Sequence, residues 1–152
     1  MITVPRNPIA DTRTCDYTKV TKDELYVASD QHIQDVGAGL ELFRDLLDTA
    51  AEHHDADKLS DIDSFHADFL TGFQQTGWWD RHRQKNRHHL LAADGVPVDV
   101  NLIDVLDFIA DMVMARAARG ADFPIELPSE LLQTAFKNTV DLLQRQVVVE
   151  EA

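Results

Sequence analysis

The chain has 152 residues, a length that suits one domain with an ordinary hydrophobic core. Its formal net charge of −13 argues against a protein that coats nucleic acid, because binding a polyanion needs clustered cations, but it is compatible with a small phosphorylated substrate. The single cysteine, Cys15, excludes an internal disulfide, and no apolar run reaches the length of a membrane span, so we expect a cytoplasmic protein without a signal peptide or membrane partner.

The first predicted helix follows an N-terminal arm. Residues 1–20 carry two prolines and no sustained hydrophobic period, which predicts an irregular arm before a single helical domain over 21–152. Thr21 and Glu24 have the spacing of a capping box, which marks a helix start. Apolar residues then recur at steps of three and four, as on a helix face that packs on a core: Ile33, Val36, Leu40, Phe43 and Leu47. Taken alone, His32 is a boundary histidine beside that face.

The predicted helix ends in a concentrated polar stretch, Glu52–Lys58, which contains two histidines, two aspartates and a lysine. The adjacent pair His54-Asp55 offers an imidazole nitrogen and a carboxylate oxygen from one short piece of backbone. Both can bind the same divalent cation when the helix end fixes their directions. The stretch therefore predicts a metal-binding corner.

Residues 78–91 form the next predicted helix of interest, and it holds four of the fourteen cations: Arg81, Arg83, Lys85 and Arg87. A solvated basic face is the ordinary explanation. On a helix, however, His82, Asn86 and His89 share one face, whereas His88 points elsewhere. Two imidazoles and an amide beside cations suit a second metal ion or a phosphate oxygen, with His88 as an alternative ligand to His89.

A long helix is predicted over 99–119, and Gly120 is expected to end it. Asp104, Asp107 and Asp111 form an acidic stripe opposite its apolar face. An exposed stripe is the usual explanation, but apolar residues border these acids, which favours a polar cavity. Because buried carboxylates are costly unless paired or metal-bound, the stripe predicts a nearby cation.

A last amphipathic helix begins near Ser129, and no stretch alternates convincingly as a strand. The sequence therefore predicts an all-α fold, a compact bundle of about five or six helices.

His32, the HDxxK stretch from His54 to Lys58, and Asp111 occur in the order found in HD domains, which this chain resembles over roughly positions 30 to 115. HD domains form a superfamily of metal-dependent phosphohydrolases. His82–His89 also resembles the HxxxNxHH element of a small, mostly phage and bacterial HD-like group without a settled function. The resemblance implies an HD-like helical fold and reverses the ordinary interpretation of His32.

The resemblance implies a hydrolase site with one or two divalent ions. The first ion would be bound by His32, His54, Asp55 and Asp111, and a second by His82 with His89 or His88, with Asp55 as the bridge. This mixed nitrogen and oxygen set suits Mn, Fe, Co, Ni or Zn, and less surely Mg.

The remaining polar residues would bind the phosphate group of the substrate or activate water. Phosphate would be oriented by cations and an amide: Lys58, Arg81, Arg83, Lys85 and Asn86. Asp107 is expected to lie behind the ligands or to act as the base, if neighbours raise its pKa. Lys58 and Asp107 are the expected catalytic residues.

The expected function is hydrolysis of a nucleotide or other small phosphate ester, with monoesters favoured. Within the enzyme class, a phosphodiesterase of nucleotide signals is an alternative. From another class, the alternative is a non-enzymatic acidic helical interaction module with a structural metal or none. The sequence is compatible with a monomer and with a homo-oligomer.

Overall fold

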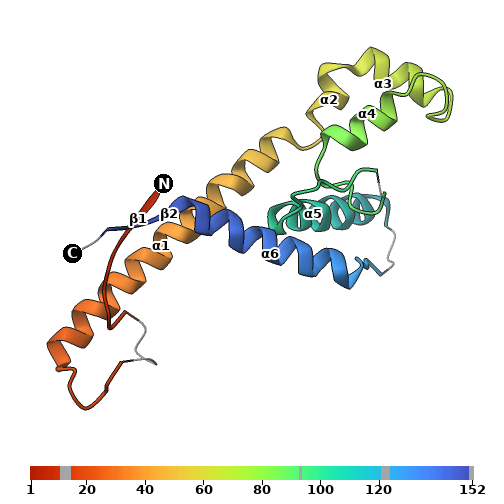
Figure 1. The fold of residues 1–152 in the computed structure, drawn as a ribbon. Coiled ribbons are helices and arrows are strands. Elements are labelled where there is room, and N and C mark those ends of the chain that lie inside the picture. The colour runs from red at the N-terminus through yellow and green to blue at the C-terminus, as the bar shows by residue number, and fades with distance from the viewer. Residues whose placement is uncertain (11–14, 93, 121–123, 151–152) are drawn as a thin grey trace. The chain divides into compact units, whose positions relative to one another are not determined.

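The protein is described by a computed structural model that covers residues 1–10, 15–92, 94–120 and 124–150 (Figure 1). The elements, in chain order, are β1 (Ile2–Pro5), α1 (Lys22–His53), α2 (Ala56–Ser60), α3 (Ile62–Phe69), α4 (Trp78–Lys85), α5 (Leu102–Arg119), α6 (Ser129–Gln146) and β2 (Val147–Glu150). The described residues are mostly helical, which confirms the predicted all-α class.

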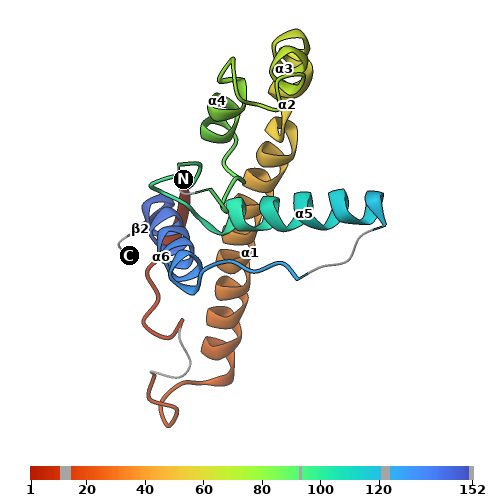
Figure 2. The same ribbon diagram turned by 90° about the vertical axis from the view of Figure 1, so that its right-hand side faces the viewer.

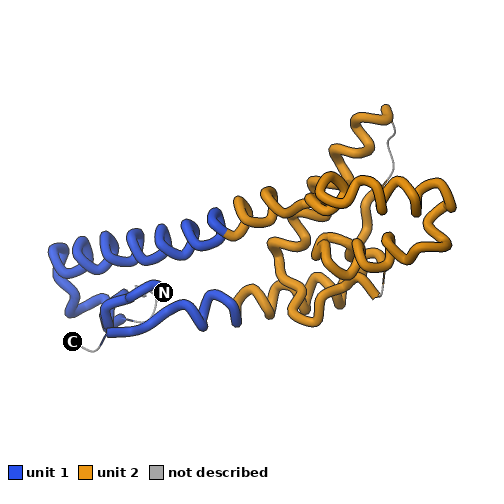
Figure 3. The backbone as a smooth tube through the Cα atoms, turned by 90° about the horizontal axis from the view of Figure 1, so that it is seen from above, with its two compact units in different colours: residues 1–45, 141–152 blue, residues 46–140 orange. Residues whose placement is uncertain are grey.

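The chain packs as two compact units (Figure 3). Unit 1 comprises Met1–Asp45 and Asp141–Ala152, and unit 2 comprises Leu46–Val140. The residues of interest for metal binding lie in unit 2, with the exception of His32.

A small sheet corrects the expectation of an entirely irregular N-terminal arm. β1 and β2 pair in parallel, with Ile2 opposite Val147 and Pro5 opposite Glu150. Both segments are rich in β-branched residues, which favour strands. Each strand is only four residues long, too short for a clear alternation, and its partner lies at the other end of the sequence.

The start and end of α1 are where the sequence placed them. The backbone N–H of Thr21 donates to the Glu24 carboxylate at 2.8 Å, and the N–H of Glu24 donates to the Thr21 hydroxyl at 3.3 Å, as in the predicted capping box. The helix ends at His53. Its expected core-facing seam is not packed along its whole length, because Ile33 is 68 % and Leu40 is 62 % exposed.

Unit 2 holds the main described core. In Figures 1 and 2, α2, α3 and α4 lie together. The buried core around α5 consists of Leu90, Val100, Val105, Phe108 and Ala135. Asn101 caps α5 by accepting from the backbone N–H of Ile103 at 2.8 Å, and Gly120 ends the helix with φ 63°.

None of the described helices combines the length and the apolar character that crossing a bilayer requires.

Candidate metal centre

Asp55 lies in the turn between α1 and α2, with a left-handed backbone φ of 54°. Aspartate tolerates this conformation better than most residues do. Its backbone N–H donates to Oδ1 of Asn86 at 3.2 Å, and the Lys58 ammonium donates to its carboxylate. These bonds fix the Asp55 carboxylate beside His54.

The first group of potential ligands comprises His54, Asp55 and His88, whose ligand atoms lie within 4.8 Å of one another. Nε2 of His54 is 3.6 Å from Oδ2 of Asp55, and Nε2 of His88 is 3.5 Å from Oδ1 of Asp55. Oδ1 of Asp111 is 4.0 Å from Nε2 of His54. Of the four ligands predicted for the first ion, His54 and Asp55 therefore lie together with His88, and Asp111 lies beside His54.

The second group comprises Asp55, His82 and His89, again within 4.8 Å. Oδ1 of Asp55, Nε2 of His82 and Nε2 of His89 are buried and make no hydrogen bond within the described part of the chain, although Oδ1 of Asp55 lies 3.3 Å from Nε2 of His82. Buried polar atoms are normally bonded, so three of them facing one another call for an explanation. One shared cation would satisfy all three atoms.

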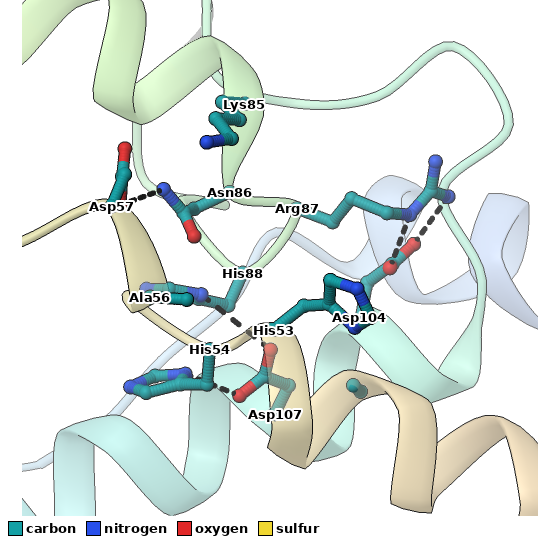
Figure 4. Close-up of a pocket in the computed structure, with 11 residues that line it drawn as sticks. His53, His54, Ala56, Asp57, Lys85, Asn86, Arg87, His88, Asp104 and Asp107 are labelled. Carbon is teal, nitrogen blue, oxygen red and sulfur yellow. Dashed lines mark hydrogen bonds and ion pairs between the residues drawn. The ribbon is translucent and has the colours of Figure 1, made fainter. Parts of the chain in front are cut away.

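Carboxylates hold the opposite nitrogens of three of these imidazoles, and Figure 4 shows the two that face Asp107. Nδ1 of His54 is 2.8 Å from Oδ1 of Asp107, and Nδ1 of His88 is 3.5 Å from Oδ2 of the same carboxylate. Nδ1 of His82 is 3.0 Å from Oδ1 of Asp57. This arrangement is typical of metal-binding histidines, because it orients the ring and leaves the Nε2 lone pair for an ion.

The charges of Asp55 and His89 also suit a cation. Burial alone would raise the pKa of Asp55, but its close contacts with His82 and Lys58 outweigh burial and lower that pKa. Burial, followed by the charges of His88 and His82, lowers the pKa of His89 to about 4. An ionised carboxylate and a neutral imidazole are the forms that bind metals. At His88, burial would lower the pKa, but its interactions with Asp107 outweigh burial and raise it, so this imidazole would have to give up a proton more readily held than usual.

Asp107 does not have the raised pKa that a base role required. Burial would raise the pKa of Asp107, but its interactions with His88 and His54 outweigh burial and lower it. Its contacts favour a positioning role for the two imidazoles.

The helical face drawn through His82, Asn86 and His89 is wrong, because α4 ends at Lys85 and Asn86 is already extended, with φ −94° and ψ 113°. His88 and His89 lie on the segment after the helix. His88, which that face excluded, is 2 % exposed and faces Asp55 and Asp107. A helix period cannot be extended across an unrecognised helix end.

Asn86 serves the turn rather than a substrate. Its Nδ2 donates to Oδ1 of Asp57 at 3.0 Å and to the backbone carbonyl of His82 at 3.0 Å. Its Oδ1 accepts from the backbone N–H of Asp55. These bonds connect the two segments that carry the ligands.

The predicted phosphate-binding cations have different surroundings. Arg81 is exposed and donates to the carbonyl of Thr76, and Lys85 is exposed on a hollow of about 200 Å³. Lys58 contacts the Asp55 carboxylate and lies 6.0 Å from the Trp79 ring. Arg83 lines a second hollow of about 320 Å³, together with His88, His89 and Asp111.

Asp104 does not face a cation site as the acidic stripe implied. Its carboxylate accepts from Nε of Arg87 at 2.7 Å and from Nη2 at 2.9 Å. It also accepts from the backbone N–H of Asn101 in the capping box of α5. The buried charge of Asp104 is therefore compensated by the capping bond and by Arg87, without a metal ion.

His32 belongs to neither group of potential ligands found among the described residues. His32 belongs to unit 1 and lines an apolar hollow of about 360 Å³ with side chains such as Val36, Leu40 and Phe43. It shares the continuous helix α1 with His53. A helix rises by about 1.5 Å per residue, so positions about twenty residues apart on one helix lie roughly 30 Å apart and cannot share an ion.

Asp57 is the residue near the ligands that sequence reasoning passed over. It is 8 % exposed and bonds both His82 and Asn86. Its place two residues after Asp55, in a stretch already recognised as polar, was the available signal.

Comparison with protein-family models, curated protein sequences and solved structures finds no match to this chain.

Proposed function

We propose that this protein is a divalent-metal-dependent phosphohydrolase that acts on a nucleotide or another small phosphate ester, with monoesters favoured. The observation that carries the proposal is the set of buried, unbonded atoms Asp55 Oδ1, His82 Nε2 and His89 Nε2. The chemistry of these atoms fits a divalent ion. Two imidazoles that face the Asp55 carboxylate are already oriented by other carboxylates, His54 by Asp107 and His82 by Asp57.

Each residue has a distinct part in this proposal. His54, Asp55 and His88, with Asp111 close by, would hold one ion, and Asp55, His82 and His89 would hold the other. Asp55 belongs to both groups and would be shared by the two ions. The mixed nitrogen and oxygen set suits Mn, Fe, Co, Ni or Zn, whereas Mg prefers a set made of oxygen ligands. Such ions would activate water and neutralise charge on a phosphoryl oxygen.

The positioning residues keep this arrangement fixed. Asp107 orients His54 and His88, Asp57 orients His82, and Lys58 holds the Asp55 carboxylate. Preorganised groups act without reorganising during the reaction, so this support favours catalysis.

The test is phosphate release from a panel of nucleotides and simple phosphate esters with each metal added in turn. We expect the wild type to be active, chelation to abolish the activity, and metal return to restore it. His54→Ala and Asp55→Ala should be inactive. The matched controls are His66→Ala and Asp63→Ala on α3, because both side chains are exposed and belong to neither ligand group.

The alternatives give different outcomes in the same experiment. A phosphodiesterase would cleave diesters of the panel faster than monoesters. A non-enzymatic interaction module would retain a stoichiometric metal, or none, and release no phosphate from any ester. Elemental analysis of the purified protein separates these two forms of the module.

We also propose a cytoplasmic location, from the single cysteine of the chain. Fractionation of cells that produce the protein tests it, and recovery outside the cytoplasm would contradict it.

A further inference from the structure

Two hollows adjoin the cluster in unit 2, and they meet different parts of it. The smaller one, about 200 Å³, is lined by the positioning carboxylates Asp57 and Asp107 and by His54 and His88 of the first ligand group (Figure 4). The larger one, about 320 Å³, is lined by His88, His89 and Asp111. The larger hollow therefore meets both ligand groups, through His88 and His89, whereas the smaller one meets only the first group, through His54 and His88, and the carboxylates that orient the imidazoles.

Arg83 distinguishes the larger hollow electrostatically. Its Nη1 donates to Asp94 at 2.8 Å and its Nη2 to Asp80 at 2.7 Å, which fixes the guanidinium in place. Its Nε is buried and donates to no group within the described residues. A fixed arginine with a donor to spare is a suitable contact for a phosphoryl oxygen.

The arginine of the smaller hollow differs in this respect. Nε and Nη2 of Arg87 both donate to the Asp104 carboxylate, and Nη1 donates to Asp99. Each of its nitrogens is therefore already bonded to an acidic residue. The smaller hollow thus sets three carboxylates, from Asp57, Asp104 and Asp107, beside an arginine that is already engaged, and Lys85 is the cation left there to face a phosphate dianion.

The other walls of the larger hollow are apolar and aromatic. They are formed by Trp79, Leu90, Leu91, Ala92, Phe108 and Met112. Its volume of about 320 Å³ lies at the lower end of the range for small-ligand pockets, roughly 300–1,000 Å³. An apolar wall beside a cation-binding cluster suits a molecule with one charged end and one flat or apolar end.

We infer that the larger hollow is the substrate subsite and that it takes a phosphate monoester whose alcohol part is aromatic, such as a nucleoside, with Arg83 binding the phosphoryl group. This inference rests on the proposed function for its catalytic consequence, but it makes a separate claim about binding. The phosphoryl end lies toward His88, His89 and Arg83, and the ring lies toward Leu91 and Met112.

The experiment measures binding of phenylphosphonate, which carries a phosphoryl dianion and a ring but no ester bond to cleave. Titration calorimetry is performed on the full chain incubated with Mn²⁺, with methylphosphonate as the matched probe that lacks the ring. We expect phenylphosphonate to bind more tightly than methylphosphonate. Equal binding of the two probes would overturn the assignment of the apolar wall.

Two variants locate the probe. Arg83→Gln should weaken phenylphosphonate binding by roughly ten- to a hundredfold, as expected for the loss of a charge-assisted hydrogen bond. Leu91→Trp, at an exposed position on the rim, should fill the hollow and weaken binding without unfolding the protein. Arg44→Gln is the control for the arginine, because Arg44 also pairs with two carboxylates but lies in unit 1. Leu70→Trp, also at an exposed position, is the control for added bulk.

The outcomes separate this inference from the proposed function. If the wild type hydrolyses esters while Arg83→Gln and Leu91→Trp change neither binding nor KM, the subsite is wrong and the function stands. If the wild type binds phenylphosphonate through Arg83 but hydrolyses no ester, the subsite stands and the function is wrong. If the wild type does not bind the probe, the inference is overturned.

Discussion

Histidines occupy two different kinds of surroundings in this protein. In unit 1, His32 lines a hollow whose other walls are mostly apolar. In unit 2, His54, His82 and His88 each face one carboxylate through Nδ1 and the Asp55 carboxylate through Nε2. A histidine is therefore well placed to bind a metal when a second group orients its ring. Its position in a sequence pattern does not ensure that such a group is present.

The largest effect is expected from Asp55, which belongs to both ligand groups. Asp55→Asn keeps the size and the tolerance of a left-handed backbone but removes the charge. We expect the affinity for both ions to fall by more than about 100-fold and phosphate release to be lost. The fall exceeds the loss of affinity that is typical when a residue that orients a ligand is replaced. Elemental analysis and circular dichroism measure this, with Asp63→Asn as control. Unchanged metal content would remove Asp55 from the centre.

Single histidine variants should separate the two ions. His89→Gln removes a ligand only from the second group, and His54→Gln removes one only from the first. We expect each variant to bind about one ion where the wild type binds about two, since the partner group keeps its ligands. Metal titration by calorimetry counts them, and His66→Gln should behave as wild type. Loss of both ions in either variant would indicate a single site.

The orienting carboxylates should have an intermediate effect. Asp107→Asn disturbs two imidazoles and Asp57→Asn disturbs one. Loss of such a partner typically lowers metal affinity by about 10- to 100-fold. We expect Asp107→Asn to lie at the upper end of that range and Asp57→Asn at the lower end, as measured by competition with a chelator. If both leave the affinity unchanged, the comparison between the two kinds of histidine loses its basis.

A smaller effect should follow from crowding His89. A Cβ added at Gly95 would lie 2.7 Å from the backbone carbonyl oxygen of His89 and 3.1 Å from its Cβ. Gly95→Ala should therefore displace His89, weaken only the second ion and destabilise the protein by about 1–3 kcal/mol. Thermal unfolding and metal titration check this. Gly37→Ala is the control, because its Cβ would meet nothing within 4 Å.

The sequence predicted the helical class and the start and end of α1, because capping and periodicity are local signals. It also grouped His54 and Asp55 with His82 and His89, which the structure brings together. It could not place His88, because that required the end of α4 at Lys85, and neither Gly nor Pro marks that end. The paired strands were missed because each depends on a partner at the far end of the chain.

The acidic stripe of α5 shows the same limit within one helix. Asp104, Asp107 and Asp111 share a face, yet Asp104 caps its own helix, Asp107 holds imidazoles and Asp111 lies near His54. Periodicity gives the face on which a side chain lies, but its partner comes from another segment. The different roles of these three aspartates could therefore be assigned only from the tertiary structure.

The smallest effect is expected from His32, and that makes it the most direct test of the comparison. The side chain is exposed, and substitutions at such surface positions usually change the free energy of unfolding by no more than about 0.5 kcal/mol. We therefore expect His32→Ala to retain full metal content, full phosphate release and a wild-type unfolding temperature. Phe43→Ala in the same hollow should lower stability by up to about 3 kcal/mol, because it removes a half-buried ring. A loss of metal in His32→Ala with stability unchanged would show that His32 is a ligand. The order of residues in the HD-like pattern would then be a better guide to this centre than the continuous helix α1.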